Sequence, residues 1–248
     1  MIEFFEKSRP AFRHVMGIVE HYRADLLKIG HAPPPAPRWN QDWFPRLDGA
    51  LAYVFVRALK PARIIEVGAG HSTRFLARAV ADEGLETAIT TIDPSPKRSP
   101  SALPVEHLKV KVQELPVDRF EALKSGDMLV IDSSHRHAPG SDVAFLLDEI
   151  LPRLPAGTLV HLHDIFLPDP YPPDWAWRGY SEQQSLSPLL ASGRFECLFS
   201  SHYVSRWMSE ILTPSVIKRL PIPEGAHESS LWLRVAPGSG VASTLPRD

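Results

Sequence analysis

Asp132 and Asp164 each follow an apolar run typical of a strand, and a histidine stands close to each of them in the sequence. His135 lies three residues after Asp132, and His163 directly precedes Asp164. Two carboxylates that converge repel each other unless a cation or a shared proton lies between them. Acids and histidines together can hold a divalent ion, and a histidine can accept a proton near neutral pH. These four residues are the first candidates for chemistry.

A glycine turn forms a second candidate site. The β-branched run 64–67 stops at Gly68-Ala69-Gly70, and apolar residues then recur at helical spacing. Glycines allow backbone to approach a ligand closely, and the helix that follows directs free N–H groups into the same space. Ser72 or Thr73 is placed to cap its first turn. The pattern predicts half of a nucleotide-type site, although a purely structural turn in an α/β protein is the alternative.

Glu66 and Asp93 bear on which ligand the turn would take. The dinucleotide fingerprint places a third small residue where this chain has Thr73. Glu66 would repel a pyrophosphate but suits a ligand with an ammonium or sulfonium group. Asp93 lies 23 residues after Gly70, where a carboxylate can accept both hydroxyls of a ribose. Asp93 therefore fits an adenosine-bearing ligand of either kind.

Strand and helix patterns alternate along most of the chain, which predicts a doubly wound parallel sheet. In such a sheet the ligand binds at the carboxyl ends of the strands, so the glycine turn and both acids should share one edge. An amphipathic N-terminal segment and a proline-rich connector at 31–37 precede the alternation. We predict strands at 64–67, 88–93, 107–112, 127–132, 157–163, 195–199 and 230–235. We predict helices at 48–59, after the glycine turn, near 120–123, and at 143–151 and 181–190, with an interrupted helix at 205–220.

The Glu-x-Gly-x-Gly of Glu66 to Gly70 resembles the first motif of class I S-adenosylmethionine-dependent methyltransferases. The closing pair of strands resembles the seventh-strand insertion of that family, and the resemblance covers residues 48–235. It implies a Rossmann-like, seven-stranded, mostly parallel sheet with an antiparallel last strand, S-adenosylmethionine as cofactor, and an N-terminal helical extension. The cofactor contacts that it implies are Glu66, Gly68, Ala69, Gly70, Ser72, Asp93, Gln113, Glu114 and Asp132.

The acids after the fourth and fifth strands look like those of the branch that includes metal-dependent catechol and sugar O-methyltransferases. That resemblance implies Asp132, His163 and Asp164 as ligands of Mg²⁺ or Mn²⁺, with His135 as general base and Asp132 also catalytic. His163 stands where the branch has an acid or amide, and imidazole suits manganese, iron or zinc better than magnesium. Either another ion binds, or the histidines act as bases or substrate contacts. A zinc site built from His135, His137, His161 and His163 is a further alternative.

Composition limits the partners. The net charge is −2, which gives no electrostatic basis for binding nucleic acid or an anionic membrane. No apolar run is long enough to span a bilayer and the first residues do not resemble a secretion signal, so we expect a cytoplasmic protein. Cys197, the single cysteine, should be a buried structural thiol. Trp43, Phe44 and the aromatic loop 165–180 could cover a substrate or pack in a homo-oligomer.

We expect three parts: an N-terminal extension with its connector (1–47), a methyltransferase domain (48–237) and a flexible tail (238–248). The expected function is O-methylation of a small organic molecule with S-adenosylmethionine, with a divalent metal as an optional aid. The alternatives are an NAD-dependent oxidoreductase and a non-catalytic protein that keeps the cofactor pocket. The sequence does not identify the methyl acceptor.

Overall fold

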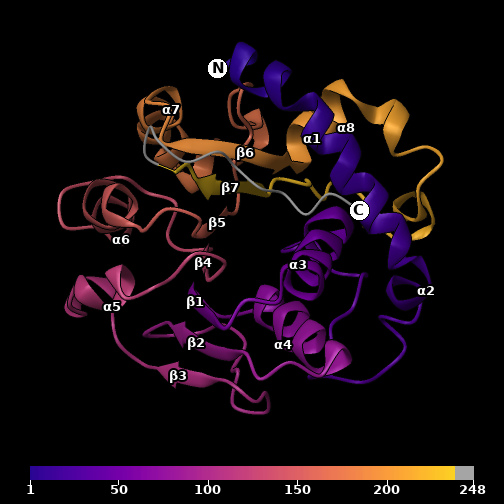
Figure 1. Cartoon of the computed structure of the whole chain (residues 1–248), viewed down its shortest axis with the longest axis horizontal. Coiled ribbons are helices and arrows are strands. Elements are labelled where there is room, and N and C mark those ends of the chain that lie inside the picture. The colour runs from indigo at the N-terminus through magenta and orange to yellow at the C-terminus, as the bar shows by residue number, and fades with distance from the viewer. Residues whose placement is uncertain (238–248) are drawn as a thin grey trace.

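The computed structural model describes residues 1–237, and the predicted tail at 238–248 lies outside the described residues. Seven strands form one sheet in the order β3-β2-β1-β4-β5-β7-β6, seen nearly edge-on in Figure 1. The strands are β1 (Arg63–Val67), β2 (Ala88–Ile92), β3 (Glu106–Leu108), β4 (Met128–Ile131), β5 (Leu159–Leu162), β6 (Phe195–Ser200) and β7 (Leu231–Val235).

The sheet is parallel from β3 through β5, and β7 runs antiparallel to both of its neighbours, β5 and β6. The predicted doubly wound sheet with an antiparallel last strand is therefore confirmed. The last strand is inserted between the fifth and sixth strands instead of extending the edge. This order places the carboxyl ends of β1, β4 and β5 side by side, and the predicted site residues follow those ends.

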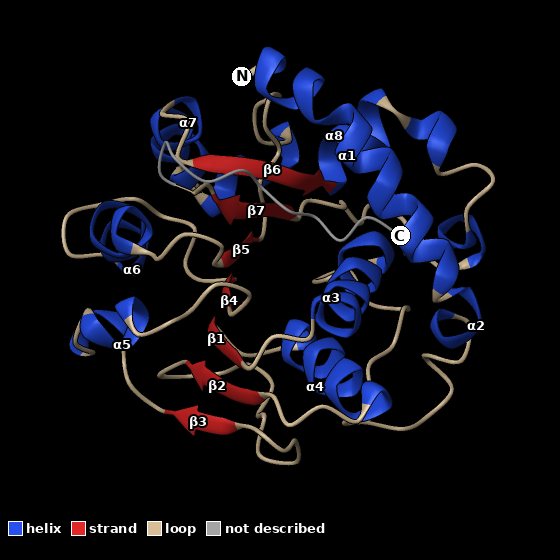
Figure 2. Ribbon diagram, viewed as in Figure 1, coloured by secondary structure: helices blue, strands red, loops and turns tan. Residues whose placement is uncertain are grey.

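Helices cover both faces of the sheet (Figure 2). The long α1, with α3 and α4, lies on one side, and α5, α6 and α7 lie on the other. The helices are α1 (Ile2–His21), α2 (Arg23–Leu26), α3 (Arg46–Leu59), α4 (His71–Glu83), α5 (Asp118–Glu121), α6 (Asp142–Ala144), continued as a π-helix over Phe145–Ile150, α7 (Glu182–Ala191) and α8 (Ser201–Trp207).

One predicted strand is shorter than expected. The strand expected at 107–112 ends at Leu108, because β2, the strand it pairs with, ends at Ile92, which pairs with Leu108. The chain then forms a short 3₁₀ helix at Val112–Glu114. The interrupted helix expected at 205–220 is observed as the end of α8 and two 3₁₀ turns, Ser209–Ile211 and Val216–Arg219.

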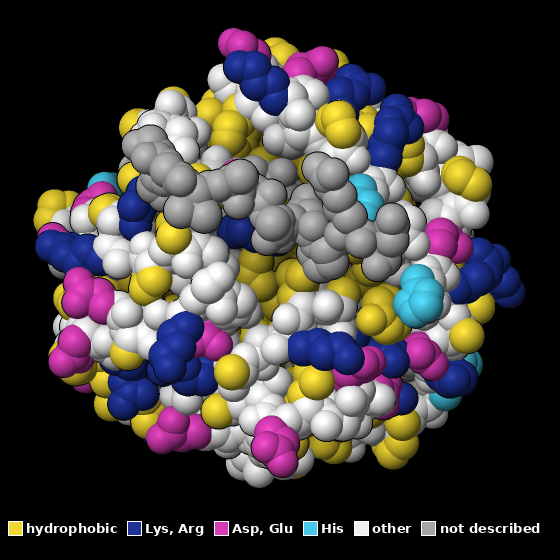
Figure 3. Space-filling view, in the orientation of Figure 1, with side chains coloured by type: hydrophobic (Ala, Val, Ile, Leu, Met, Phe, Trp, Pro, Cys, Tyr) yellow, Lys and Arg dark blue, Asp and Glu magenta, His cyan; other side chains and the backbone are white. Residues whose placement is uncertain are grey.

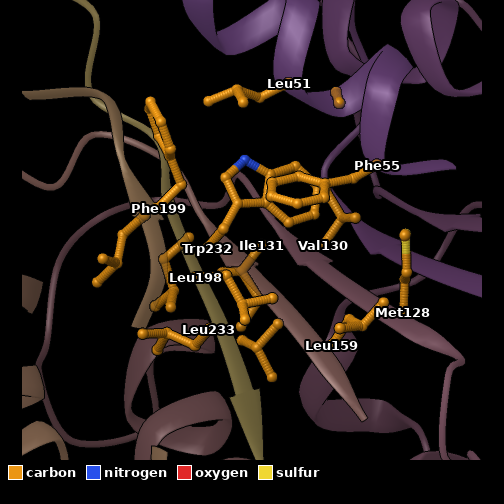
Figure 4. Close-up of a cluster of buried hydrophobic side chains, with 14 of the residues drawn as sticks. Leu51, Phe55, Met128, Val130, Ile131, Leu159, Leu198, Phe199, Trp232 and Leu233 are labelled. Carbon is orange, nitrogen blue, oxygen red and sulfur yellow. The ribbon is translucent and has the colours of Figure 1, made fainter. Parts of the chain in front are cut away.

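The core lies between α3 and the centre of the sheet (Figure 4). The Trp232 ring of β7 is 4.7 Å from the Phe55 ring of α3, centroid to centroid, and both side chains are buried. Strands β4 and β5 are buried at every position, as expected for strands covered on both faces. The predicted buried thiol is Cys197 of β6. This packing provides a rigid platform for the loops that follow β1, β4 and β5.

The surface carries charges of both signs. On the face shown in Figure 3, basic and acidic side chains are scattered among each other, with no broad area of one sign. Within residues 1–237, no helix has the length and apolar character needed to cross a bilayer.

Candidate active site

The turn after β1 is built around the carboxyl group of Glu66, which is fully buried. The Ser72 hydroxyl donates to Glu66 Oε1 at 2.6 Å, and the Thr73 hydroxyl donates to Oε2 at 2.7 Å. Thr73 Oγ1 also accepts from the Gly70 backbone N–H, as expected for a residue that caps the first turn of α4. Burial raises the pKa of Glu66 to about 8, so its carboxyl group is mostly protonated at neutral pH.

Gly68 joins the first and fourth strands at their carboxyl ends. Its φ is +102°, and a Cβ placed on it would lie 2.1 Å from the backbone oxygen of Asp132. The Gly68 N–H donates to the Ile92 carbonyl, and the Asp132 N–H donates to the Val67 carbonyl, both at 2.9 Å. Only glycine fits here, and its small size is what brings Asp132 next to the turn.

One cavity of about 440 Å³ opens above these strand ends. From the first half of the site it is lined by Ala69, Gly70, Asp93 and Ser95, and from the second half by Asp132, His135, His163 and Asp164. Asp93 is fixed at the wall by accepting from the N–H groups of Ala69 and Ser95. The predicted convergence of the glycine turn with both acid-tipped strands is what the structure shows.

Asp132, His135, His163 and Asp164 form a tight cluster in this cavity. Asp132 Oδ1 lies 3.4 Å from His135 Nε2 and 3.5 Å from His163 Nδ1. Asp164 Oδ2 lies 3.5 Å from His135 Nε2, and Asp164 Oδ1 lies 3.4 Å from His163 Nδ1. Each imidazole therefore faces both carboxylates.

Charge on the cluster follows from these contacts. Burial disfavours charge on both histidines, but for His135 the carboxylates of Glu182, Asp132 and Asp164 outweigh it, and the pKa rises well above its usual range. The pKa of His163 rises in the same way, because Asp164, Asp132 and Asp48 surround it. These two rings in turn hold the pKa of Asp132 far below its ordinary value, against the effect of burial. The cluster is a buried set of ion pairs at neutral pH.

Residues 65–165 match the family model of a methyltransferase domain. This range holds the glycine turn, Asp93 and the whole four-residue cluster, on a sheet with the strand order described above. In this part of the chain the sequence is therefore similar to a methyltransferase domain. No curated protein sequence matches the chain.

Several solved methyltransferase structures resemble the fold of this chain. The enzyme PaMTH1 of Podospora anserina, bound to S-adenosylhomocysteine, is 19% identical over 88% of this chain and 94% of its own, with a TM-score of 0.48. An O-methyltransferase of Bacillus cereus is 15% identical over 89% of this chain and 90% of its own, with a TM-score of 0.49. TomG of Streptomyces achromogenes, from tomaymycin synthesis, is 18% identical over 77% of this chain and 80% of its own, with a TM-score of 0.48. At this level of similarity the comparison concerns the fold, and the acceptors of those enzymes are not carried over to this chain.

Two buried acids complete the cluster, and the sequence patterns missed both. Glu182, the first residue of α7, places Oε1 2.6 Å from His135 Nδ1 and is 1% exposed. Asp48, inside α3, lies 3.3 Å from His163 Nε2 and also accepts from the backbone N–H groups of Ser229 and Ser230. Asp48 had one signal in the sequence, because it is the single acid of a mostly apolar helix, whereas Glu182 had none.

Backbone strain is concentrated at this cluster. In residues 1–237, three residues other than glycine have positive φ, and two of them are His135 at +59° and Asp164 at +56°. Such conformations cost free energy and persist where the surroundings determine them, often at functional sites. The strain here directs the His135 and Asp164 side chains into the cavity.

The aromatic loop 165–180 also reaches the cavity, through Trp175, Arg178 and Tyr180. The Tyr180 ring lies 4.5 Å from the His135 ring, centroid to centroid. The Ser181 N–H donates to the His135 carbonyl at 2.9 Å, which ties the end of the loop to the base candidate. Trp43 and Phe44 line the cavity as well. Both predicted aromatic segments therefore cover the cluster.

Some predicted residues lie elsewhere. Glu66, Gly68 and Ser72 support the turn but do not line the cavity, and neither do Gln113 and Glu114. The Gln113 amide donates to the Gly140 carbonyl at 3.0 Å. An adenine contact by Gln113 or Glu114 stays a prediction.

The remaining histidines do not join a zinc site. His161 Nε2 lies 2.8 Å from the Ser230 hydroxyl, and burial lowers its pKa to about 3. His137 pairs with Asp148 at 3.1 Å.

The donor set does not suit a resident magnesium ion. Two of its four groups are imidazoles, and both are charged partners of the carboxylates that would have to bind the metal. Across the described chain, no group of three or more His, Cys, Asp or Glu side chains is arranged to hold a metal ion. The metal role of Asp132, His163 and Asp164 stays a prediction.

Proposed function

We propose that this methyltransferase transfers the methyl group of S-adenosylmethionine to a hydroxyl oxygen of a small molecule, with His135 as the general base. The observation that carries the proposal is the single cavity in which the glycine turn and Asp93 face Asp132, His135 and Asp164. A donor held along the turn and an acceptor held under the aromatic loop would meet at that cluster.

The bound cofactor supplies an electrophilic methyl group on a sulfonium. The protein has four tasks in this scheme. Ala69, Gly70 and Asp93 bind the nucleoside end of the donor, and the carboxylate of Asp132 stabilises positive charge beside the turn. His135 Nε2 accepts the proton of the acceptor hydroxyl, and the aromatic loop orients the acceptor and excludes water.

Glu182 determines which nitrogen of His135 is available. Its carboxylate is 2.6 Å from Nδ1, so the ring keeps a proton on Nδ1 and presents Nε2 to the cavity. Because the pKa of His135 is raised, the ring is an imidazolium in the resting protein at neutral pH. The neutral, proton-accepting form appears as the pH rises through that raised pKa. We therefore expect the rate to increase with pH above neutrality.

Metal-assisted transfer is the second form of this proposal. It rests on the two carboxylates and two imidazoles of the cluster, whose facing atoms lie 3.4 to 3.5 Å apart. The raised histidine pKa values oppose it, because a metal binds only neutral imidazole. We adopt the metal-free form and test it by chelation.

The test compares two histidines of the same loop. Purified protein is titrated with S-adenosylhomocysteine and NADH by calorimetry, and methyl transfer from labelled S-adenosylmethionine is measured against a panel of hydroxylated small molecules. We expect binding of S-adenosylhomocysteine alone, and loss of transfer by at least about 100-fold in His135→Gln. The control is His137→Gln, since His137 lies outside the cavity and pairs with Asp148.

Three results would contradict the proposal. Binding of NADH without S-adenosylhomocysteine would reverse the choice of cofactor. Wild-type rates of methyl transfer by His135→Gln would show that His135 is not the general base. Binding of S-adenosylhomocysteine without transfer to any acceptor would favour a non-catalytic protein.

The proposal also includes the setting of the reaction. We place the enzyme in the cytoplasm, with a small molecule and not nucleic acid as acceptor, and we keep residues 48–237 as the catalytic domain with 1–47 as an extension. Asp42, Trp43 and Phe44 of that extension line the cavity. The extension should therefore be needed for activity. A homo-oligomer is compatible with this scheme, and sedimentation of the purified protein would determine it.

A further inference from the structure

The aromatic loop 165–180 begins with a turn at 166–169 that one buried side chain closes. Within the turn the Asp169 N–H donates to the Phe166 carbonyl at 2.9 Å. From the first turn of α7, Gln183 Oε1 accepts from the Phe166 N–H at 3.0 Å, and Gln183 Nε2 donates to the Asp169 carbonyl at 3.1 Å. Gln183 is 3% exposed and does not line the cavity. Both ends of its amide hold the turn against α7, and removing the amide would deprive two backbone groups of this partner.

The turn at 166–169 supports the side chains of the loop that face the cavity. The Phe166 ring, which is 1% exposed, lies 5.1 Å from the Trp175 ring, centroid to centroid, with an interplanar angle of 77°. Trp175 lines the cavity, and the Arg178 guanidinium, which also lines it, lies 4.0 Å from the centre of the Trp175 ring. A chain of contacts thus leads from Gln183 through Phe166 to two side chains that face the cavity.

The beginning of α7 also holds the proposed base. Glu182 directly precedes Gln183, and its Oε1 lies 2.6 Å from His135 Nδ1. The Ser181 N–H donates to the His135 carbonyl at 2.9 Å, and the Ser181 hydroxyl accepts from the His137 N–H at 3.0 Å. Three consecutive residues therefore join the loop after β4 to the aromatic loop. Within this joint, adjacent side chains have separate roles, since Glu182 contacts the base and Gln183 contacts the aromatic loop.

Helix α8 supports the same turn from another side. Asp169 Oδ2 lies 2.8 Å from His202 Nε2 and accepts from the Trp207 indole N–H at 3.3 Å. The His202 ring also lies 5.1 Å from the Phe166 ring, centroid to centroid. These contacts do not involve Gln183. Loss of the Gln183 amide should therefore loosen the turn without unfolding the domain.

We propose that Gln183 is a positioning residue for the methyl acceptor, because it holds the aromatic loop in the shape that receives this molecule. The inference rests on the proposed function in one respect, that the acceptor binds beneath this loop. Gln183 acts through Phe166 and Trp175. A loop that is already held in place spares the acceptor the free energy of ordering it. Loss of the amide therefore weakens the acceptor and leaves the cofactor, held at the glycine turn, unaffected.

The experiment compares Gln183→Met with Gln184→Met in the full-length protein. Methionine keeps the length of the side chain and removes both hydrogen bonds, and Gln184, the next residue of α7, is exposed and serves as the matched control. Gln183→Glu keeps the oxygen that accepts from the Phe166 N–H, so it should lie between wild type and Gln183→Met. The measurements are the affinity for S-adenosylhomocysteine by calorimetry, KM and kcat with an acceptor from the panel of hydroxylated molecules, and hydrogen–deuterium exchange of the aromatic loop.

We expect Gln183→Met to raise the KM of the acceptor about tenfold, with a smaller change in kcat and wild-type affinity for S-adenosylhomocysteine. The pH dependence of transfer stays that of wild type, because Glu182 still pairs with His135. Hydrogen exchange becomes faster in the aromatic loop alone. Gln184→Met leaves all of these quantities unchanged. A merely structural role would instead lower Tm and weaken both ligands.

Two outcomes would overturn the inference. In the first, Gln183→Met keeps the wild-type KM of the acceptor, whether or not the exchange of the loop changes. In the second, it weakens the acceptor and S-adenosylhomocysteine to the same degree, which would mean a general loss of structure.

Failure of the proposed function gives a different result, because the wild-type protein itself would then bind no S-adenosylhomocysteine and transfer no methyl group. Hydrogen exchange of the aromatic loop decides the role of Gln183 in that case. Faster exchange in Gln183→Met than in Gln184→Met supports the positioning of the loop by Gln183, and equal exchange in the two variants overturns it.

Discussion

Replacing Gly68 by alanine should damage both the stability of the domain and its chemistry, whereas the same change at Gly70 should spare the fold. A Cβ at position 68 would lie 2.1 Å from the Asp132 carbonyl oxygen, and non-bonded atoms need at least 3.0 Å. Either Asp132 or the turn must therefore move by about 1 Å. Neither moves freely, because hydrogen bonds of 2.9 Å fix the Gly68 N–H to Ile92 and the Asp132 N–H to Val67.

The size of the effect follows from this geometry. A side chain at φ +102° costs about 1 to 3 kcal/mol, and the steric overlap adds to it, so we expect a loss of roughly 3 kcal/mol in the free energy of unfolding. For a domain of this size, that lowers Tm by roughly 6 to 12 °C. Where the protein still folds, a 1 Å shift of Asp132 should lower kcat by about 100-fold.

Gly70 is the matched control. Nothing lies within 4 Å of a Cβ built there, and its φ of −174° is open to any residue. We expect Gly70→Ala to keep the wild-type Tm within about 2 °C. It should still weaken S-adenosylhomocysteine, because Gly70 lines the cavity. Thermal unfolding and calorimetric titration of both variants would check this, and an unchanged Tm for Gly68→Ala would refute the close approach of β1 and β4.

Further predictions concern the buried acids. Glu182→Gln should lower the pKa of His135, so the alkaline rise of the rate moves toward neutral pH while kcat falls; a pH profile identical to wild type would contradict the pairing. Asp48→Asn removes the carboxylate that faces Nε2 of the buried His163, and it should lower the free energy of unfolding by about 3 kcal/mol. Urea unfolding would measure this, with Asp82→Asn on the exposed side of α4 as control. Burial raises the pKa of Glu66 to about 8, so the unfolded chain loses this proton at a lower pH than the folded protein does. The free energy of unfolding should therefore fall as the pH rises from about 4.5 to 8, by roughly 3 kcal/mol at pH 7. Glu66→Gln should remove this pH dependence, and unfolding curves taken across that range would show it. Transfer should survive EDTA, and loss of activity that Mn²⁺ restores would establish the metal-assisted form.

The sheet could be predicted because its signals are local. The run 128–131 is apolar at every position and the run 64–67 at every position except Glu66, which is the pattern of a strand covered on both faces. The parallel connections then follow from alternation with helices, and a shared edge for Asp93, Asp132 and Asp164 follows from the direction of the strands. Where the local pattern continued past the end of a partner strand, as after Leu108, the prediction was wrong.

The partners of the two central histidines could not be predicted. Asp48 reaches His163 from 115 positions away in the sequence, and Glu182 reaches His135 from 47 positions away. Both contacts depend on how α3 and α7 pack against the sheet, and hydrophobic periodicity within one segment does not indicate which residues of distant segments meet.

The sequence also could not show which of the two acids beside the turn is charged. Glu66 was expected to face a cationic ligand, yet it lies beneath the turn, bonded to two hydroxyls, and burial raises its pKa to about 8. Asp132 borders the cavity, and the rings of His135 and His163 keep it ionised. The negative charge next to the cavity therefore comes from the fourth strand, while the glutamate of the motif shapes the turn. It follows that Asp132→Asn should weaken a sulfonium ligand more than its uncharged sulfur analogue, whereas Glu66→Gln should affect both alike.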